Sequence, residues 1–360
     1  MRAALIRAAG QDKTEIAELS VRAVGPLDVR IRVRAAGVCH SDLSAMSGVL
    51  PNKKPFVLGH EGAGEVVEAG PLVPGLAPGD RVIVCWVPPC GLCAACLRGE
   101  AALCSELFGP TALTPNFEES GAPVYGMCGT GTLAEELVVP WQCAVKVPED
   151  VPFDVAALIG CGVTTGVGAA IHTSKVRPGE TVAVIGCGGV GLAAVNGAAI
   201  AGAGRIIAID TSPAKDNMAR LFGATDFINA AETDPVAAVM EMTGGGVHHS
   251  FEAIGLAKTA EQAFNMLRRG GTANVIGMIP VGQTISLMGA AFLGEKRIQG
   301  SAMGSNRFPV DMPRFVDFYL SGKLKLDEMI SRRIKLEDIN DAFAEMKTGQ
   351  IARSVIVFDA

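Results

Sequence analysis

The stretch Thr181–Gly191, TVAVIGCGGVG, decides the fold of the central part of the chain. Its first five residues are apolar or β-branched, which favours a buried strand. The next six fit the pattern G-x-G-x-x-G, and an uncharged stretch typical of a helix follows. Glycines in such a turn let the backbone approach a pyrophosphate, and the amino end of the helix favours its negative charge. The stretch therefore predicts a dinucleotide-binding loop that uses Gly186, Gly188, Gly189, Val190 and Gly191.

An acidic residue in the next predicted strand supports this interpretation. Asp210 follows the apolar segment Arg205–Ile209 and lies 19 residues after Gly191. A carboxylate there accepts hydrogen bonds from the ribose hydroxyls and repels a 2′-phosphate, which favours NAD over NADP. Lys215, one helical turn later, could add a ribose contact or simply be a solvated lysine. A glycine-rich turn without a ligand is the alternative, and the strand, helix and acid together argue against it.

Outward from this loop, two kinds of pattern divide the chain. From about 154 to 300, apolar strands alternate with helical stretches, which predicts a doubly wound parallel sheet. Before 150, short β segments such as Val29–Ala35 alternate polar and apolar residues between Gly and Pro, which predicts a mainly β, antiparallel and barrel-like unit. The last sixty residues should form helices at 308–320 and 336–346 and a strand at 354–358.

The composition limits the class of protein. The chain has 360 residues, 49% hydrophobic, which fits two folded domains and excludes disorder. A net charge of −6 without long basic runs argues against nucleic-acid or membrane partners. The uncharged segment 181–204 is long enough for a bilayer, but its seven glycines favour the strand–turn–helix interpretation. No secretory signal is recognisable, so we expect a soluble, cytoplasmic protein.

Four of the ten cysteines form a compact cluster in the sequence. Cys90, Cys93, Cys96 and Cys104 lie within 15 residues. Four thiolates at this spacing can close a tetrahedron around zinc, and such a closed site is structural because it leaves no position for a substrate. An iron–sulfur cluster is the alternative, although nothing else in the sequence suggests electron transfer.

A second set of potential metal ligands is dispersed. Cys39 follows an apolar strand, His60 lies about 20 residues later, and Cys161 comes near the start of the alternating half. One imidazole and two thiolates leave a fourth coordination position open, as in a catalytic zinc site. Taken singly, Cys161 could be a small buried hydrophobic residue and His60 a core histidine.

Several motifs together resemble a known family. GHEGAGEVVEAG at 59–70, PGDRV at 78–82, the four-cysteine lobe and the glycine-rich loop are similar to those of the zinc-dependent medium-chain alcohol dehydrogenases. The resemblance runs over essentially the whole chain. It implies a mainly β, GroES-like catalytic domain from 1–162 and 303–360, with a structural zinc lobe at about 88–106, and an NAD-binding Rossmann domain at 163–302.

The resemblance also implies roles at the dispersed metal set. Cys39, His60 and Cys161 match the catalytic zinc ligands, and Glu61 matches an acid that can transiently bind the metal. Asp42 matches the carboxylate that orients the histidine. Two zinc ions per chain, one catalytic and one structural, are therefore expected.

Further positions match a proton relay and cofactor contacts. Ser41 matches the hydroxyl that takes the alcohol proton, Thr165 a position against the nicotinamide, and Arg353 a pyrophosphate contact. His40 stands where many relatives carry Arg, which should make cofactor affinity sensitive to pH. Ser44 replaces the histidine that ends the relay in several relatives, so the proton should leave through water or His40.

The substrate class follows from the pocket positions that the resemblance implies. All of them are apolar and most are bulky: Leu50, Trp86, Phe108, Met127, Met278 and Met303. We expect primary alcohols with apolar or aromatic substituents, oxidised reversibly to aldehydes with NAD. The family also implies a homodimer, with a homotetramer as the alternative.

Two other functions stay open at this point. A formaldehyde-type dehydrogenase acting on hydroxymethylglutathione shares the fold, zinc and NAD, but it needs a basic anchor, and residues 105–123 contain no Lys or Arg. A zinc-stapled NAD-binding protein without catalysis is the second rival, and the intact Cys39, His60 and Cys161 set argues against it.

Overall fold

The chain forms two compact units in the computed structural model, which describes residues 1–349 and 351–359. Unit 1 comprises Met1–Cys161, Arg307–Gly322 and Leu326–Ala360, and unit 2 comprises Gly162–Asn306 and Lys323–Lys325. The main boundaries fall within a few residues of 162 and 303, but the short return at 323–325 has no signal in the sequence. Gln350 and Ala360, which belong to the predicted range 303–360, lie outside the described residues.

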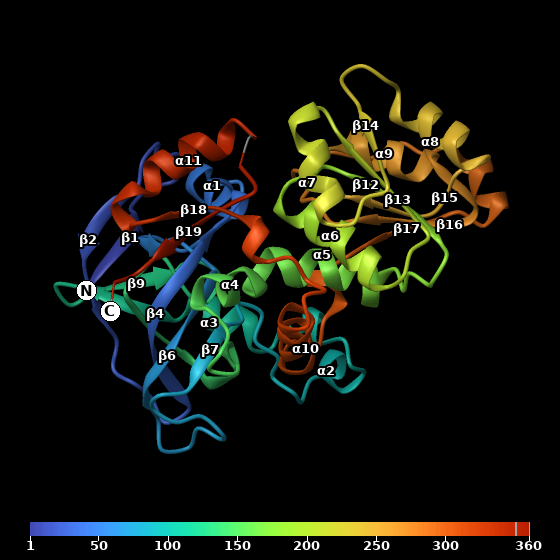
Figure 1. The fold of residues 1–360 in the computed structure, drawn as a ribbon. Coiled ribbons are helices and arrows are strands. Elements are labelled where there is room, and N and C mark those ends of the chain that lie inside the picture. The colour runs from blue at the N-terminus through green and yellow to red at the C-terminus, as the bar shows by residue number, and fades with distance from the viewer. Residues whose placement is uncertain (350, 360) are drawn as a thin grey trace. The chain divides into compact units, whose positions relative to one another are not determined.

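Unit 2 contains a six-stranded sheet whose neighbours are all parallel, in the order β14-β13-β12-β15-β16-β17 (Figure 1). The stretch TVAVI is β12, in the interior of this sheet, and the doubly wound parallel prediction is confirmed. The strands are β12 (Thr181–Ile185), β13 (Arg205–Asp210), β14 (Asp226–Asn229), β15 (Val247–Glu252), β16 (Leu267–Val275) and β17 (Arg297–Gly300).

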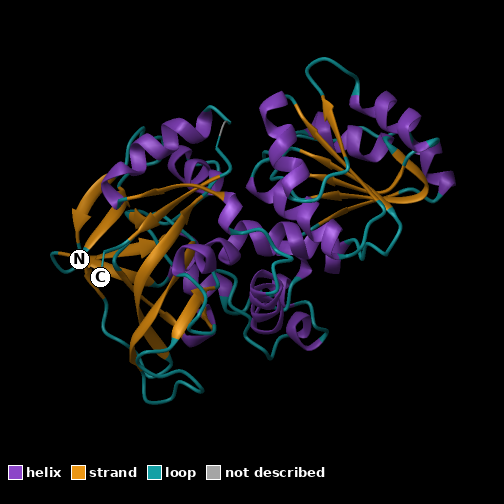
Figure 2. Ribbon diagram, in the orientation of Figure 1, coloured by secondary structure: helices purple, strands orange, loops and turns teal. Residues whose placement is uncertain are grey.

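The helices of unit 2 pack along this sheet (Figure 2). They are α5 (Thr164–Gly168), α6 (Gly189–Ile200), α7 (Asp216–Leu221), α8 (Pro235–Thr243) and α9 (Ala257–Asn265). Helix α6 begins in the glycine-rich loop and is buried from Gly191 to Ala198, because apolar and small residues surround its whole circumference. Helix α8 was not expected from the sequence. Its start nevertheless carries a sequence signal, because Asp234 is an N-cap that accepts a hydrogen bond from the Val236 N–H.

Unit 1 is mainly β, as expected, and has two sheets. One has the order β2-β1-β5-β9-β8-β3; the other has the order β11-β7-β6-β4-β19-β18, with β10 also paired to β4. The strands are β1 (Arg2–Ile6), β2 (Glu15–Glu18), β3 (Ser20–Val21), β4 (Asp28–Val38), β5 (Phe56–Val57), β6 (Glu61–Ala69), β7 (Arg81–Val84), β8 (Pro115–Glu119), β9 (Ala122–Gly126), β10 (Glu136–Pro140), β11 (Ala144–Lys146), β18 (Ile330–Ile334) and β19 (Arg353–Val357).

The expectation that unit 1 is wholly antiparallel is wrong at two pairs. Strands β5 and β9 run parallel, and so do β18 and β19. A parallel pair needs a crossover connection, and helix α11 (Ile339–Lys347) supplies one between β18 and β19. The other helices of unit 1 are α1 (His40–Ser47), α2 (Ala94–Leu97), α3 (Phe108–Leu113), α4 (Phe153–Leu158) and α10 (Phe308–Leu320).

Strand β4 organises unit 1 because three other strands pair with it. It pairs antiparallel with β6, β10 and β19, so the C-terminal strand lies against an N-terminal one (Figure 1). Residues Ser354 and Val38 are partners in this register. The buried side chains of β1, β4, β5 and β6 join those of α11 in one hydrophobic core. Strands β6 and β19 thereby hold the end of β4, directly before Cys39, from both sides.

A long apolar helical run connects the two units along the chain. It extends from Phe153 to Thr173, through α4, a π-helical turn at Ile159–Val163, α5 and a second π-helical turn at Ala169–Thr173. Its 21 residues pass a length and hydropathy test for a membrane span, but 89% of the tested window is buried inside the protein. Its apolar character therefore follows from packing in the core.

A buried asparagine offers a test of the packing of unit 1. Asn116, in β8, donates from Nδ2 to the carbonyls of Gly129 at 2.9 Å and Val138 at 3.0 Å, and its Oδ1 accepts from the Gly126 N–H at 3.0 Å. Asn116→Ala leaves three buried polar groups without these partners, so we expect unit 1 to lose about 2 kcal/mol of unfolding free energy.

Urea unfolding followed by tryptophan fluorescence measures this loss. Both tryptophans, Trp86 and Trp141, belong to unit 1, so their fluorescence reports on that unit alone. The exposed neighbour Thr114→Ala is the matched control and should shift the free energy by less than about 0.5 kcal/mol. Equal midpoints for the two variants would contradict the prediction.

Candidate active site

The dispersed metal-binding set comes together at the end of β4. Cys39 follows β4 as the N-cap of α1, and Glu61 opens β6 opposite Gly37 of β4. His60, which directly precedes β6, therefore lies at the same end of this antiparallel pair as Cys39. Cys161 reaches them from the π-helical turn, a kind of distortion that is frequent at functional sites. One potential ligand atom from each of Cys39, His60, Glu61 and Cys161 lies within 4.8 Å of the others, and all four residues are buried. We call these four residues the buried metal cluster.

Asp42 fixes the geometry of this cluster. Its Oδ2 accepts from the Cys39 N–H at 2.8 Å, and its Oδ1 accepts from the Gly59 N–H at 3.1 Å. The same Oδ1 lies 3.5 Å from Nδ1 of His60, on the side away from a metal bound at Nε2. Within residues 1–349 and 351–359, neither ring nitrogen of this buried imidazole makes a hydrogen bond. An imidazole without hydrogen bonds beside two thiols has the chemistry of a zinc ligand.

The charges inside the cluster favour a cation. A hydrogen bond from Cys161 and the charge of Arg353 place the pKa of Cys39 well below its ordinary value, despite burial. Burial acts to lower the pKa of His60, but its interactions with Cys161 and with the Asp42 carboxylate raise that pKa well above its ordinary value. Proton and metal compete for the same nitrogen, so the pocket that attracts the proton also attracts Zn²⁺.

Glu61 and Arg353 form a buried ion pair beside the cluster. Nη2 of Arg353 lies 3.2 Å from Oε1 of Glu61, and Nη1 donates to the Val38 carbonyl at 3.2 Å. Burial raises the pKa of Glu61 to about 7, although the arginine charge opposes the rise. Gly37 is required here, because a Cβ at that position would lie 2.1 Å from Oε2 of Glu61. The pyrophosphate contact of Arg353 stays a prediction.

The four-cysteine lobe also converges. One sulfur from each of Cys90, Cys93, Cys96 and Cys104 lies within 4.8 Å of the others, and all four are free thiols. Backbone N–H groups point at these sulfurs: Leu92 and Cys93 donate to Cys90 at 3.4 and 3.2 Å. These two amides lower the pKa of Cys90 to about 7. Four converging thiols with amide donors fit a closed zinc site.

The glycine-rich loop of unit 2 has the conformation that its sequence predicts. Gly186 has φ +95°, and a Cβ on Gly191 would lie 1.7 Å from the Gly186 carbonyl oxygen. Asp210 accepts from the Cys187 N–H at 2.8 Å and from the Ser212 N–H at 2.9 Å, so both oxygens are held at the end of β13. These bonds fix the carboxylate beside the loop, where a ribose hydroxyl would meet it.

The remaining predicted cofactor residues lie in different environments. Lys215 is 8% exposed in the turn before α7, so the solvated-lysine alternative is wrong. Thr165 donates from Oγ1 to the sulfur of Met303 at 3.3 Å, and both residues are buried in unit 2. His40 is exposed at the start of α1, and Ser44 donates to its carbonyl oxygen.

Four of the six predicted pocket residues gather in unit 1. The ring of Trp86 meets that of His60 edge-on at 5.8 Å between centroids, and Phe108 lies 5.8 Å from Trp86. Leu50 packs against the same hydrophobic core, which includes Met127. Ser41, the predicted proton acceptor, has its Oγ 3.7 Å from the Cys39 sulfur. The other two, Met278 and Met303, belong to unit 2, where Met278 is about half exposed.

One buried acid of unit 2 escaped the sequence reasoning. Glu252 ends β15, and its Oε1 accepts from the N–H groups of Ile254 and Gly255 and from the Thr259 hydroxyl. It holds the turn at the carboxyl edge of the sheet, where open α/β sheets bind their ligands. The signal in the sequence that could have identified Glu252 was a charged residue at the end of an apolar strand.

Two glycine substitutions distinguish loop packing from cofactor contact. Gly191→Ala should lower both the melting temperature of the free protein and NADH affinity, the latter about tenfold or more, because overpacking costs about 1–3 kcal/mol. Gly188 has φ −78° and open space around its missing Cβ. Gly188→Ala should therefore leave the melting temperature unchanged and weaken NADH binding alone, as measured by calorimetric titration. Unchanged affinity in both variants would contradict a pyrophosphate at this loop.

Comparisons with known proteins agree with this geometry. Residues 25–149 match the alcohol dehydrogenase GroES-like domain, and residues 189–320 match the zinc-binding dehydrogenase family. The chain is 38% identical to an alcohol dehydrogenase class-3 of Cereibacter sphaeroides and 40% identical to an S-(hydroxymethyl)glutathione dehydrogenase of Escherichia coli O139:H28, each match covering 99% of both chains.

A solved structure has the same fold over almost the whole chain. The benzyl alcohol dehydrogenase of Acinetobacter calcoaceticus superposes with a TM-score of 0.92 at 33% identity and 99% coverage of both chains. The matching families, the two converging thiol sites and the glycine-rich loop lead to one assignment. The chain belongs to the zinc-dependent medium-chain alcohol dehydrogenase family and is an NAD-dependent oxidoreductase that uses zinc.

Proposed function

We propose that the protein oxidises the hydroxymethyl adduct of a thiol, such as S-(hydroxymethyl)glutathione, with NAD as hydride acceptor. The C–H bond of the adduct gives a hydride to NAD⁺ and its hydroxyl loses a proton, so the products are an S-formyl thiol, NADH and H⁺. The likeness to relatives of this name over 99% of both chains carries the proposal. The thiol adduct replaces the apolar primary alcohols, which the pocket residues predict, as the substrate that we propose first.

We propose that two lysines outside the segment 105–123 act as the basic anchor. Lys53 and Lys54 are exposed on the loop after α1, and Nζ of Lys53 lies 4.4 Å from the centre of the Tyr125 ring. The neighbouring Asn52 accepts from the Cys128 N–H at 3.4 Å. Burial raises the pKa of Cys128 to about 11, and the charges of the buried metal cluster act on it too. We propose that the carboxylates of the adduct pair with these two lysines.

Oxidation of aromatic primary alcohols is the second candidate function. The ring of Trp86 makes edge-on contacts with His60 and with Phe108, which puts apolar rings next to the buried metal cluster. Such rings favour a flat apolar substituent, and the structural likeness to a benzyl alcohol dehydrogenase points the same way.

The proposal assigns a role to each residue of the site. Zinc held by Cys39, His60 and Cys161 supplies a Lewis acid that makes a hydroxyl more acidic. Asp42 keeps the His60 ring oriented, and Ser41 takes the hydroxyl proton. The glycine-rich loop and Asp210 hold NAD by its pyrophosphate and ribose, so that position and orientation lower the barrier.

Compartment and assembly complete the proposal. Ten free thiols, six of them in two potential zinc sites and the other four buried, fit the reducing cytoplasm. We infer a homodimer, with a tetramer as the alternative. Strand β17 lies at the end of the parallel sheet of unit 2 and offers backbone groups for pairing.

A substrate panel tests the proposed substrate. With formaldehyde, NADH should form only when glutathione is present, and kcat/KM for the adduct should exceed that for benzyl alcohol by about tenfold or more, a difference of about 1.4 kcal/mol in barrier. The measurement is absorbance of NADH. Thiol-independent turnover with benzyl alcohol as the better substrate would reject the adduct and support the second candidate.

The lysine anchor has its own test. Changing Lys53 and Lys54 together to Gln should raise KM for the glutathione adduct roughly 5-fold, because exposed ion pairs contribute up to about 1 kcal/mol. The adduct of 2-mercaptoethanol, which has no carboxylate, should be unaffected. Lys347→Gln on α11 is the control for loss of an exposed charge. Equal KM changes for both adducts would contradict a carboxylate anchor.

Metal analysis tests the two zinc sites separately. We expect two zinc ions per chain in the wild type and one in Cys39→Ala, which should lose turnover but keep NADH binding and thermal stability. Cys93→Ser should also contain one zinc but should unfold at a lower temperature, because a structural ion stabilises its loop. Turnover by Cys39→Ala would contradict the assignment of the catalytic site.

A further inference from the structure

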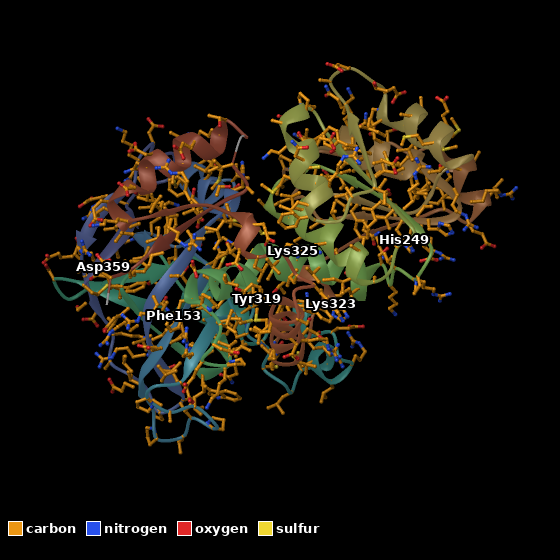
Figure 3. All side chains as sticks on the ribbon, viewed as in Figure 1. Phe153, His249, Tyr319, Lys323, Lys325 and Asp359 are labelled. Atoms are coloured by element: carbon orange, nitrogen blue, oxygen red, sulfur yellow. The ribbon has the colours of Figure 1, made fainter. Side chains whose placement is uncertain are left out.

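A serine, a histidine and a glutamate are linked in unit 2, away from the glycine-rich loop. Ser174 follows the second π-helical turn, and Glu180 directly precedes β12. His249, labelled in Figure 3, lies in β15 beside Val182. The glycine-rich loop begins after Ile185, at the other end of β12. The three side chains therefore lie towards the amino edge of the parallel sheet, and the dinucleotide loop lies at its carboxyl edge.

The hydrogen bonds have directions that the chemistry determines. Oε2 of Glu180 lies 2.8 Å from Nε2 of His249, and Nδ1 of His249 lies 2.6 Å from Oγ of Ser174. Burial acts to raise the pKa of Glu180, but the Arg177 N–H and His249 bring it below its ordinary value, so the group is a carboxylate. A carboxylate only accepts, which places the neutral ring's proton on Nε2. Nδ1 then accepts the hydroxyl proton of Ser174.

An amide completes the arrangement on the serine side. Nδ2 of Asn274 donates to Oγ of Ser174 at 2.9 Å, and Oδ1 of Asn274 accepts from Nε2 of Gln299 at 2.9 Å. The Asn274 side chain is fixed by this bond and lies beside the serine oxygen. Nδ2 also donates to the Ser250 carbonyl at 3.1 Å, so both hydrogens of this buried amide are used, and Asn274 acts by fixing the position of the Ser174 oxygen.

We propose that Ser174 is a nucleophile, activated by His249 and positioned through Glu180, that accepts an acyl group from activated carboxylic esters. A nucleophile bonded to a base that is in turn oriented by a third group is the arrangement of covalent catalysis. Oγ of Ser174 bonds to the carbonyl carbon while its proton passes to Nδ1 of His249. The ester C–O bond then breaks. The leaving alkoxide or phenoxide takes the proton from Nδ1 of His249 and departs as an alcohol or phenol. The product is an O-acyl serine.

The site is open to such a reagent. Ser174 is partly exposed, and the side chains of His249 and Glu180 are 12% and 24% exposed. Nearby hydroxyls lack this activation: Oγ1 of Thr173 is bonded to the hydroxyls of Ser301 at 2.9 Å and Ser305 at 2.8 Å. Ser301 and Ser305 therefore serve as matched controls in the same unit.

Acetylation by p-nitrophenyl acetate, located by peptide mass spectrometry, tests the proposal. The full-length protein should be acetylated at Ser174 and not at Ser301 or Ser305. His249→Gln should slow acetylation of Ser174 by about 100-fold, the usual contribution of a general base. Ser305→Ala should leave it unchanged, and melting temperatures confirm that each variant is folded.

Three outcomes would overturn the proposal. They are a folded wild type without acetyl on Ser174, an equal rate of Ser174 acetylation in His249→Gln, and acetylation of the control serines at the rate of Ser174. Because the readout is the modified peptide, ester cleavage at the thiols of unit 1 does not affect it. The result is also independent of which alcohol the dehydrogenase site oxidises.

Discussion

The pairing of β4 with its neighbours is the constraint on which the candidate active site depends. Strand β4 ends at Val38, directly before Cys39, while β6 begins at Glu61 and β19 begins at Arg353. The registers of β4 with β6 and of β4 with β19 bring these three ends to one place. A shift of one residue in any register would turn a ligand away, because side chains alternate faces along a strand. Asp42 then fixes the result locally, since its two oxygens hold the Cys39 amide, the Gly59 amide and the His60 ring.

Burial makes the charges of the candidate active site depend on one another. Glu61, Arg353, Asp42 and the two thiols lie where water cannot screen them, and the carboxyl group of Glu61 has its pKa raised to about 7 even beside an arginine. If Cys161 and His60 lose the protons that their raised pKa values favour, two thiolates and two carboxylates carry more negative charge than Arg353 balances. A divalent cation removes the imbalance, so the electrostatics of unit 1 and the zinc chemistry of its family support each other.

Local features of the molecule were predictable from the sequence, and features that depend on contacts between distant segments were not. The strand at 181–185, the loop from Gly186 to Gly191 and Asp210 lie within one βαβ unit, and residue type alone specifies them. The parallel pairing of β18 with β19 depends on a helical crossover between them, and the contact of Arg353 with Glu61 joins segments almost 300 residues apart. The contact of Lys53 with the Tyr125 ring was unpredictable for the same reason, because it joins two segments that are far apart in the sequence.

The short return of the chain to unit 2 limits how this protein can be recombined. Asn196 of α6 donates to the Lys323 carbonyl at 3.1 Å and accepts from the Lys325 N–H at 2.9 Å (Figure 3). A chimera that exchanges only the continuous segment from 162 to 306 would keep the host's own tripeptide at 323–325. The backbone of that tripeptide would then have to form its hydrogen bonds with a helix from another protein. Cofactor modules of this family therefore transplant cleanly only when a short piece of the C-terminal sequence travels with them.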